Sequence, residues 1–455
     1  MNQSRHSEGL RKLVHVTMAG FALLLRWIPW WAASLLALAA LLFNVLLLPR
    51  LAGESLMRPG EMKRVLRTGV AFYALSVLIL VLVFRHHLEV AACAWGILAF
   101  GDGAATLFGR WLGRPRLSWN PSKSWAGSAA FLLFGTLGGG GLMLWVAQRA
   151  GQPPEASTVF LISAAAALAG AVVESLPMEL DDNLSVPLLA GGIVFSLQRV
   201  DPGVLSDSSS ALVRSFLLGL AVTCLFALVA RWAGAVSWSG VAGGVAVGTV
   251  IATFTGMPGF AILALFFILG SAATRLGYAR KAGKGIAQES RGARGVVHAL
   301  ANCSAPAYLA FLSASTPPPL SGALRVAFVA SLATAACDTL GSEIGPLARG
   351  DPFLVTRLRR VPAGTPGAIS LAGTATGIAS ALLIAAAAVM LGLMPAGTVG
   401  IVVAAALLGT LLESFLGATL EPLGMVGSET INFINTAAGG LAAMVLLHWS
   451  GGAAS

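Results

Sequence analysis

Long apolar stretches recur along nearly the whole chain, and they constrain the fold more than any single motif. They run from Val14 to Trp449 and are separated by short loops rich in Gly, Pro and Arg. Such stretches are long enough to cross a hydrocarbon core of roughly 30 Å as helices. Of the 455 residues, 56% are hydrophobic and only 11% are charged, a balance that soluble domains do not have. The sequence therefore predicts an all-α, polytopic transmembrane helical bundle of roughly fifteen spans.

The N-terminal segment and the cysteines fit this class. The first apolar segment leads directly into a second, 30–48, without a small-residue cleavage site, so we expect a retained span and no cleaved signal peptide. The four cysteines all lie in apolar segments without a CxxC pair. They are expected to be small core residues and not zinc ligands or disulfide partners.

The formal charge of +10 is spread over many short loops. Lys and Arg concentrate at 50–67, 110–123, 275–294 and 349–360, which all fall on one side of the membrane if the spans alternate. Loops of this kind mark the cytoplasmic side. The sequence thus predicts an integral membrane protein whose N-terminus and active sites are cytoplasmic, and no nucleic-acid partner. The oligomeric state is left open.

The chain is expected to consist of two tandem halves. A polar stretch at 201–210 interrupts the apolar pattern, so we predict a linker there between a membrane domain at 1–200 and another at 211–455. Polar residues then follow a similar order in each half. The matching pairs are Asp102 and Asp338, Gly109 and Gly345, and Glu174 and Glu413. We infer a divergent tandem duplication.

Charged side chains at span ends are the candidates for chemistry in the first half. An unpaired Asp within a span costs roughly 2.5 to 3.5 kcal/mol, so such residues are functional candidates by default. The loop SKSWAGS offers a lysine, hydroxyls and a helix start, which suit phosphate, and nearby carboxylates suit Mg²⁺. The expected catalytic residues are Asp102, Lys123, Glu174, Asp181 and Asp182, with Asp102, Asp181 and Asp182 as metal ligands. The expected nucleotide-binding residues are Arg11, Lys12, His15, Gly101, Ser122, Ser124, Gly127, Ser128 and Asn183.

The second half offers a comparable set. Glycines alternate with Lys and Arg in the loop 276–295, a backbone that suits phosphate. The expected catalytic residues are Asp338, Glu343 and Glu413, with Asp338 and Glu343 as metal ligands. The expected phosphate- or nucleotide-binding residues are Lys281, Lys284, Arg291, Arg294, Asn302, Gly373, Thr374, Glu429, Asn432 and Asn435. No HExxH, GxSxG or GxxxxGK[ST] motif occurs, so a soluble kinase or hydrolase fold is not indicated.

These motifs resemble two known families. The first half is similar to the dolichol kinase and phytol kinase family of CTP-dependent membrane kinases through RKLVH (11–15), GDGAATLFGRWLG (101–113), PSKSWAGS (121–128) and ESLPMELDDNLSVP (174–187). The second half is similar to the membrane family that contains phytyl-phosphate kinase and transmembrane protein 19, through TRLGYARKAGKG, RGARGVVHALAN, ACDTLGSEIG, PAGTPGAISLAGTATG, ESFLGATLE and NFIN. Ala126 stands where the first family usually has an acidic residue, and Pro366-Gly367-Ala368 stands where the second tends to have Asn-Gly-Gly.

The resemblance implies a fusion of two kinases. The first half would phosphorylate an isoprenoid alcohol with CTP and Mg²⁺, and the second would phosphorylate the monophosphate to the diphosphate. The chain length of the alcohol, and which carboxylate accepts its hydroxyl proton, stay open. Two other classes also stay open: a phosphatidate cytidylyltransferase, which likewise joins a GD motif to a lysine loop, and a transporter, which is expected to hold its polar sites near mid-membrane.

Overall fold

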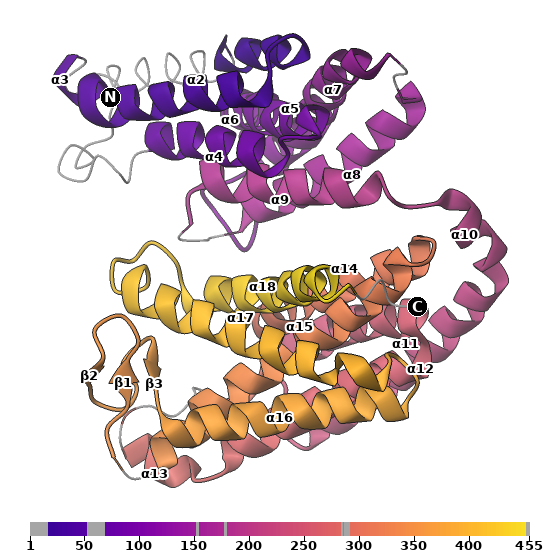
Figure 1. Ribbon diagram of the computed structural model, residues 1–455, viewed down its shortest axis with the longest axis vertical. Coiled ribbons are helices and arrows are strands. Elements are labelled where there is room, and N and C mark those ends of the chain that lie inside the picture. Colours follow the sequence, from indigo (N-terminus) through magenta and orange to yellow (C-terminus); the bar gives the residue numbers. More distant parts are fainter. Residues whose placement is uncertain are drawn as a thin grey trace. The chain divides into compact units, whose positions relative to one another are not determined.

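The computed structural model describes residues 17–51, 69–151, 154–176, 180–283, 285, 292–348 and 350–451. Within these ranges the chain is almost entirely helical, so the predicted all-α class is confirmed (Figure 1). The chain divides into two compact units, Met1–Arg199 and Val200–Ser455. Each unit is described by itself below.

The first unit is built around a buried central helix, α5 (Leu88–Gly96), in which Val90 to Ala94 are at most 1% exposed. This helix continues through a π-helical turn, Ile97–Asp102, into α6 (Gly103–Trp111). The other elements are the 3-10 helices Ala19–Arg26 and Gln148–Ala150, the π-helical turn Phe43–Leu47, and α2 (Trp30–Leu42), α3 (Leu48–Leu51), α4 (Gly69–Val83), α7 (Trp125–Ala147), α8 (Ala156–Ser175) and α9 (Asp182–Leu197).

The second unit has a central helix of the same kind, α15 (Leu320–Ile344), which packs against α14, α16, α17 and α18. The other helices are α10 (Pro202–Asp207), α11 (Ser209–Trp232), α12 (Trp238–Arg275), α13 (Tyr278–Gly283), α14 (Val296–Ser315), the 3-10 turns Gly345–Leu347 and Ala396–Thr398, α16 (Leu371–Met390), α17 (Val399–Thr419) and α18 (Ser428–Trp449). A small antiparallel sheet of β1 (Phe353–Leu354), β2 (Arg359–Arg360) and β3 (Ala368–Ile369), in the order β2-β1-β3, joins α15 to α16.

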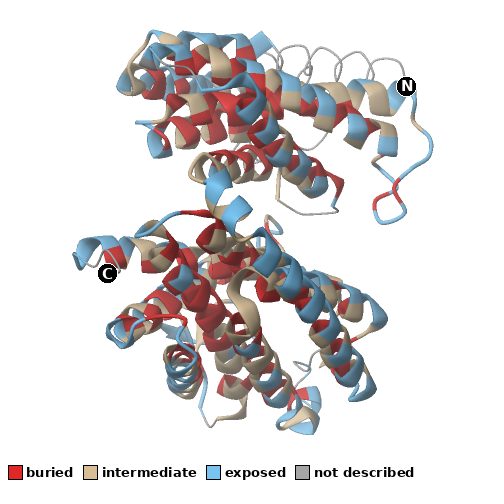
Figure 2. Ribbon diagram, turned by 90° about the vertical axis from the view of Figure 1, so that its right-hand side faces the viewer, coloured by how far each residue is buried: buried red, intermediate tan, exposed pale blue. Residues whose placement is uncertain are grey.

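The burial pattern is that of a membrane protein. The side chains inside both units are mostly small, and α15 alone buries Ala327, Ala330, Ala333 and Ala336 completely. Large apolar side chains such as Leu161 and Leu225 are exposed on the outer faces, and Figure 2 shows the buried residues gathered on the inner faces of the helices. Small residues let helices approach closely where no water drives their packing.

Eleven helices in the described ranges are long and apolar enough to cross a membrane, and α4 and α9 are shorter apolar helices. This count does not confirm the expected fifteen. One reason is that α12 holds two arms in a single element. Its backbone turns sharply at Gly256, where φ is 69° and ψ is −171°, a left-handed conformation that glycine adopts without strain. The arms then fold back on each other, because residues 240–247 and 260–267 line the same cavity.

The expected linker at 201–210 is mostly helical. Asp201 accepts a hydrogen bond from the backbone N–H of Gly203 (2.8 Å), and Pro202 occupies the first turn of α10. An Asp cap followed by Pro is a strong helix start. The polar composition of this stretch therefore reflects a capped, exposed helix and not an extended connection.

Candidate active sites

The first site forms where α6, α8, α9 and the loop before α7 meet. Lys123 lies in that loop, and its Nζ forms an ion pair with Glu174 at the end of α8 and another with Asp182 at the start of α9 (3.3 Å). The Glu174 side chain is only 5% exposed, whereas that of Asp182 is 38% exposed. Asp102 is also buried and close enough for its charge to act on both Lys123 and Asp182. The structure thus brings four of the five expected catalytic residues together, as three carboxylates around Lys123.

The electrostatics of this cluster follow from its excess of negative charge. Lys123 and Asp182 both lie outside the eleven spans. Burial alone would lower the pKa of Lys123, but the charges of Asp182 and Glu174 outweigh it and raise that pKa. Burial raises the pKa of Asp182 to about 6, and Glu174 and Asp102 add to the rise while Lys123 opposes it. A carboxyl group with a pKa near 6 is suited to exchange protons at neutral pH.

The loop around Lys123 is held by its own hydrogen bonds. Asn120 donates Nδ2 to the carbonyl of Ser175 (3.1 Å) and accepts a bond from the hydroxyl of Ser122 (2.6 Å). Ser124 caps α7, because its hydroxyl accepts a bond from the N–H of Gly127 (3.1 Å). Neither Asn120 nor Ser175 was expected to be a site residue: Asn120 lies just before the PSKSWAGS motif, and Ser175 accepts through its backbone carbonyl, which no side-chain pattern encodes.

Two other expected ligands have structural partners. Asp181 caps α9 by accepting bonds from the backbone N–H (2.9 Å) and Nδ2 (2.7 Å) of Asn183, so its carboxylate is partly used within the chain. Gly101 faces the ring of Phe131, which lies 3.1 Å from where a Cβ would be. Arg11, Lys12 and His15 lie outside the described residues, as do Lys284 and Arg291 in the second half.

The second site forms between α15, α17 and α18. The carboxyl groups of Asp338 and Glu413 lie within hydrogen-bonding reach of each other. Asn435, which is 1% exposed, donates Nδ2 to Oε2 of Glu413 (2.7 Å). At the start of α18, Glu429 pairs with Nδ1 of His298 on α14 (2.8 Å). Asn432 lies half-buried on α18, between Glu429 and Asn435.

Glu343 and Lys281 bind each other in the structure. Their side chains form an ion pair and are only 7% and 3% exposed. Lys281 also donates to the carbonyls of Ala273 (3.1 Å) and Thr274 (2.8 Å), and Thr274 donates its hydroxyl to Glu343 (3.0 Å). This network ties α13 to the ends of α12 and α15. Thr274 opens the TRLGYARKAGKG motif but was not expected to be a site residue, because its bond to Glu343 joins positions 69 residues apart.

The remaining residues expected to bind phosphate in the second half have mixed surroundings. Asn302 donates to the carbonyl of His298 (3.1 Å), and Gly373 donates its N–H to the capping hydroxyl of Ser370 (3.1 Å). The backbone N–H of Thr374 bonds the carbonyl of Ser370 (2.8 Å). The guanidinium of Arg294 lies near two phenylalanine rings.

The two sites share a local scaffold. In the first unit, a Cβ on Gly109 would meet the capping Ser124 Oγ at 3.2 Å and Cα of Gly127 at 3.6 Å. In the second, a Cβ on Gly345 would meet the capping Ser370 Oγ at 2.7 Å and Cα of Gly373 at 3.6 Å. In each unit the acidic residue lies seven positions before the first glycine. The close contact explains why glycine follows each Asp at this spacing.

Both sites also contain buried oxygen atoms that lack a partner. Among the described residues, six buried side-chain polar atoms have no hydrogen bond. Four of them belong to residues expected to bind a ligand: Ser128 Oγ, Asn183 Oδ1, Glu429 Oε2 and Asn435 Oδ1. Buried polar groups are normally paired, so each unpaired one needs an explanation. A cation or a hydroxyl-bearing ligand would supply the missing contacts.

The described residues contain no group of three His, Cys, Asp or Glu side chains arranged to hold a metal ion by themselves. Mg²⁺ rarely needs such a cage, since it is usually bound by one or two carboxylates together with substrate phosphates. Asp102 and Asp182, beside the unpaired amide oxygen of Asn183, fit that requirement. In the second unit Asp338 fits it, whereas Glu343 is held by Lys281.

The apolar helices and the acidic clusters between them define a multi-pass integral membrane protein. The chain belongs to the DUF92 family of integral membrane proteins, whose model matches residues 221–440. No solved structure matches the chain.

The relatives of this chain include a membrane protein and a protein named as a probable phytol kinase. The chain is 34% identical over 229 residues to an uncharacterised membrane protein of Synechocystis, a match that covers 50% of this chain and 86% of that protein. It is 31% identical over 215 residues to protein VTE6, chloroplastic, of Arabidopsis thaliana (46% of this chain, 65% of the relative). It is 34% identical over 203 residues to probable phytol kinase 2, chloroplastic, of Oryza sativa (41% and 66%). The chain thus spans just under two thirds of each plastid relative.

Proposed function

We propose that this protein phosphorylates an isoprenoid alcohol in its first unit and the resulting monophosphate in its second. The observation that carries the proposal is the coincidence of unpaired buried oxygens with acidic clusters at both sites, in a chain similar to a phytol kinase. The donor is proposed to be CTP, as the resemblance of the first half implies. The product would be a prenyl diphosphate.

In the first unit, Lys123 is the group that would meet the transferred phosphate. A lysine ammonium is a compact point charge that can neutralise phosphate oxygens. In the structure it is held by Glu174 and Asp182. A nucleotide phosphate arriving with its counterion would compete for these partners, so that Lys123 turns to phosphate, Asp102 holds the ion and Asp182 stays free to accept a proton. Bound Mg²⁺ would neutralise charge on the β- and γ-phosphates.

The transfer itself needs one bond to form and one to break. The prenol oxygen attacks the γ-phosphorus, the bond from that phosphorus to the β-γ bridging oxygen breaks, and CDP leaves. The hydroxyl proton passes to a carboxylate. Asp182 suits this role because it is partly exposed and its pKa is raised to about 6 by burial. Glu174 is buried beneath Lys123 and suits the role of positioning it.

In the second unit, Asp338, Glu413 and Asn435 supply the corresponding polar groups. The shared glycine contact and capping serine support a common ancestry for the two sites, and hence related chemistry. The capping hydroxyl, however, is preceded by Ile369 and not by a lysine. The positive charge that binds phosphate in the second unit must therefore come from another residue. This difference is expected if the second unit acts on a monophosphate and the first on a neutral alcohol.

A labelling experiment on the full chain in detergent tests the proposal. The protein is incubated with Mg²⁺, phytol or geranylgeraniol, and CTP labelled at the γ-phosphate, and the products are separated. We expect label in the prenyl diphosphate, accumulation of monophosphate in Asp338→Asn, and no labelled lipid in Asp102→Asn. Glu155→Gln is a matched control, because Glu155 lies at the exposed start of α8, the opposite end from Glu174.

Other outcomes decide against the proposal. If no prenol is labelled but phosphatidate yields a CDP-lipid and pyrophosphate, the protein is a cytidylyltransferase. If ATP labels the product and CTP does not, the kinase class stands and the donor is wrong. If Asp338→Asn makes diphosphate at the normal rate, the second unit does not carry the second step.

A further inference from the structure

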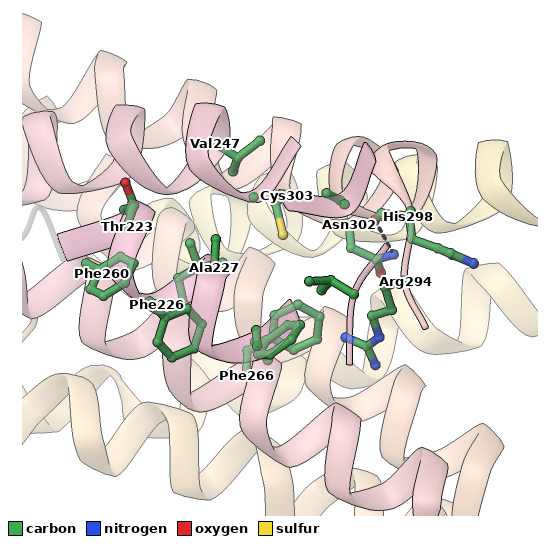
Figure 3. A pocket seen from close by; sticks show the side chains of 18 residues that line it. Thr223, Phe226, Ala227, Val247, Phe260, Phe266, Arg294, His298, Asn302 and Cys303 are labelled. Carbon is green, nitrogen blue, oxygen red and sulfur yellow. Dashed lines mark hydrogen bonds between the residues drawn. The ribbon is translucent and has the colours of Figure 1, made fainter. Parts of the chain in front are cut away.

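The second unit contains an apolar groove that ends at an arginine (Figure 3). Its cavity volume is about 90 Å³, and the groove is partly open to the surface. Its walls are α11, the two arms of α12 and the start of α14, and rings such as Phe226, Phe260 and Phe267 follow one another along it. The ring of Phe226 contacts those of Phe260 and Phe267 edge-on, with centroids 5.6 Å apart.

A small residue keeps the groove open on one side. Gly244 lines it, and no atom lies within 4 Å of the position that a Cβ would take there. Thr223 lines the far end, and its hydroxyl is used by bonds to the hydroxyl of Thr249 (2.9 Å) and the carbonyl of Leu220 (3.2 Å). The groove is therefore suited to a long apolar group and not to a nucleotide.

Arg294 lies at the other end, where Glu343 and Glu429 are close enough for their charges to act on it but do not pair with it. Its guanidinium lies 5.7 Å from the centroid of the Phe266 ring, and in the described ranges it makes no ion pair or side-chain hydrogen bond. Other arginines at helix ends, such as Arg149 and Arg275, donate to main-chain carbonyls. Gly270 gives Arg294 its room, since a Cβ there would lie 2.5 Å from Nη2. Burial lowers the pKa of Arg294, so an anion beside it would be stabilising.

A second anion-binding feature lies next to this arginine. The helix α14 begins at Val296 with Gly295 before it, and no side chain caps its first turn. The free N–H groups and dipole of a helix start attract anions, phosphate in particular. Because Arg294 directly precedes this start, the two features point to one phosphate position at the mouth of the groove.

We infer that this groove binds the isoprenoid chain of a prenyl monophosphate, with the phosphate held by Arg294 and the first turn of α14. The inference rests on the proposed function, since it gives the second unit a substrate that already carries a charge. It also explains where the second unit obtains positive charge without a lysine in its capping loop. The mouth lies near Glu343 and Glu429, whose charges act on Arg294, so the phosphate would lie among the charged groups of this unit.

The test compares long and short substrates in two matched variants. Gly244→Phe fills the groove about one helical turn beyond Gly240, which lies against the backbone of Arg294. Gly141→Phe is the control, because Gly141 also lies in a membrane helix with no atom near a Cβ position, but in the first unit. We expect Gly244→Phe to raise KM for geranylgeranyl monophosphate by about tenfold or more and to leave KM for dimethylallyl monophosphate unchanged. Gly141→Phe should have the same KM values as wild type. Arg294→Gln should raise KM for both monophosphates.

Equilibrium binding of labelled geranylgeranyl monophosphate, without nucleotide, separates this inference from the proposed function. If wild type binds this monophosphate but makes no diphosphate, and Gly244→Phe does not bind it, the groove is supported as the binding site and the second kinase step is refuted. Normal turnover with the same KM in Gly244→Phe and wild type would refute the groove. A copurified phospholipid that Gly244→Phe excludes, with substrate KM unchanged, would show that the groove holds a structural lipid and would also refute it.

Discussion

The ion pair of Lys281 and Glu343 gives the sharpest test of how the second unit works, because both residues were expected to bind ligands and the structure pairs them with each other. Replacing Lys281 by Met keeps a long apolar side chain and removes the charge. Glu343, only 7% exposed, would then keep just the hydroxyl of Thr274 as a partner. The carbonyls of Ala273 and Thr274 would also lose their donor.

The expected cost is large because solvent can replace none of these contacts. Breaking a buried ion pair by removing one partner costs about 3 to 5 kcal/mol. For a domain of this size each kcal/mol lowers the melting temperature by about 2 to 4 °C, so we expect Lys281→Met to lower it by roughly 6 °C or more. The assay is thermal unfolding in detergent, followed by the fluorescence of a thiol-reactive dye at the buried cysteines.

The double variant Lys281→Met/Glu343→Gln separates a structural role from a catalytic one. Gln can still accept the Thr274 hydroxyl but carries no charge, so we expect most of the lost melting temperature to return, together with phosphorylation of the prenyl monophosphate. The reasoning is refuted if Lys281→Met unfolds like wild type while its KM for monophosphate rises sharply, because Lys281 would then be a substrate contact. It is also refuted if the double variant is no more stable than the single one.

Further predictions concern both sites. Lys123→Met should slow prenol phosphorylation by about 100-fold or more but leave prenyl monophosphate phosphorylation intact, as two separate product assays would reveal. The prenol rate should rise with pH around 6, since Asp182, with its pKa raised to about 6, acts in its ionised form, and Asp182→Asn should remove this rise. Because that raised pKa lowers the stability of the fold as pH rises from the ordinary value of 3.8 to about 6, Asp182→Asn should unfold at a higher temperature than wild type at pH 8 and not at pH 4. Gly345→Ala should lower the melting temperature more than Gly109→Ala, because the serine oxygen lies at 2.7 Å in the first case and 3.2 Å in the second.

The sequence predicted the class of the fold, and most of the charged residues that it singled out in the first half lie together in the structure, for a physical reason. Apolar length is a local property, and a charged residue in an apolar stretch must find a partner. Asp102, Lys123, Glu174 and Asp182 all stood out by that rule, and the structure brings them together. Few partners were available to them, because each apolar stretch contains few charged residues.

The role of Asp181 and the number of spans depended on contacts and backbone angles that no local sequence pattern encodes. Asp181 was grouped with the metal ligands, but an Asp directly before a helix is often a cap, and the structure uses it as one. The span count was obscured by Gly256, where one apolar stretch folds into two arms. Glycine there is recognisable as a turn only once its positive φ is known, because the same apolar stretch contains several other glycines that are helical.

The comparison of the two units favours two different, consecutive reactions. It does not favour the same reaction in both units. Both units keep the buried acid, the glycine contact and the capping serine, which are the parts that any phosphoryl transfer at this scaffold would need. They differ in their cations: the first has Lys123 in the capping loop among three carboxylates, and the second has Ile369 there and Arg294 at the mouth of an apolar groove. A neutral alcohol needs no cation of its own, whereas a monophosphate does, because its charge would otherwise repel both the acidic site and the incoming nucleotide. If Arg294→Gln slows phosphorylation of the monophosphate and of the alcohol equally, the assignment of one substrate to each unit is wrong and the two units act on the same substrate.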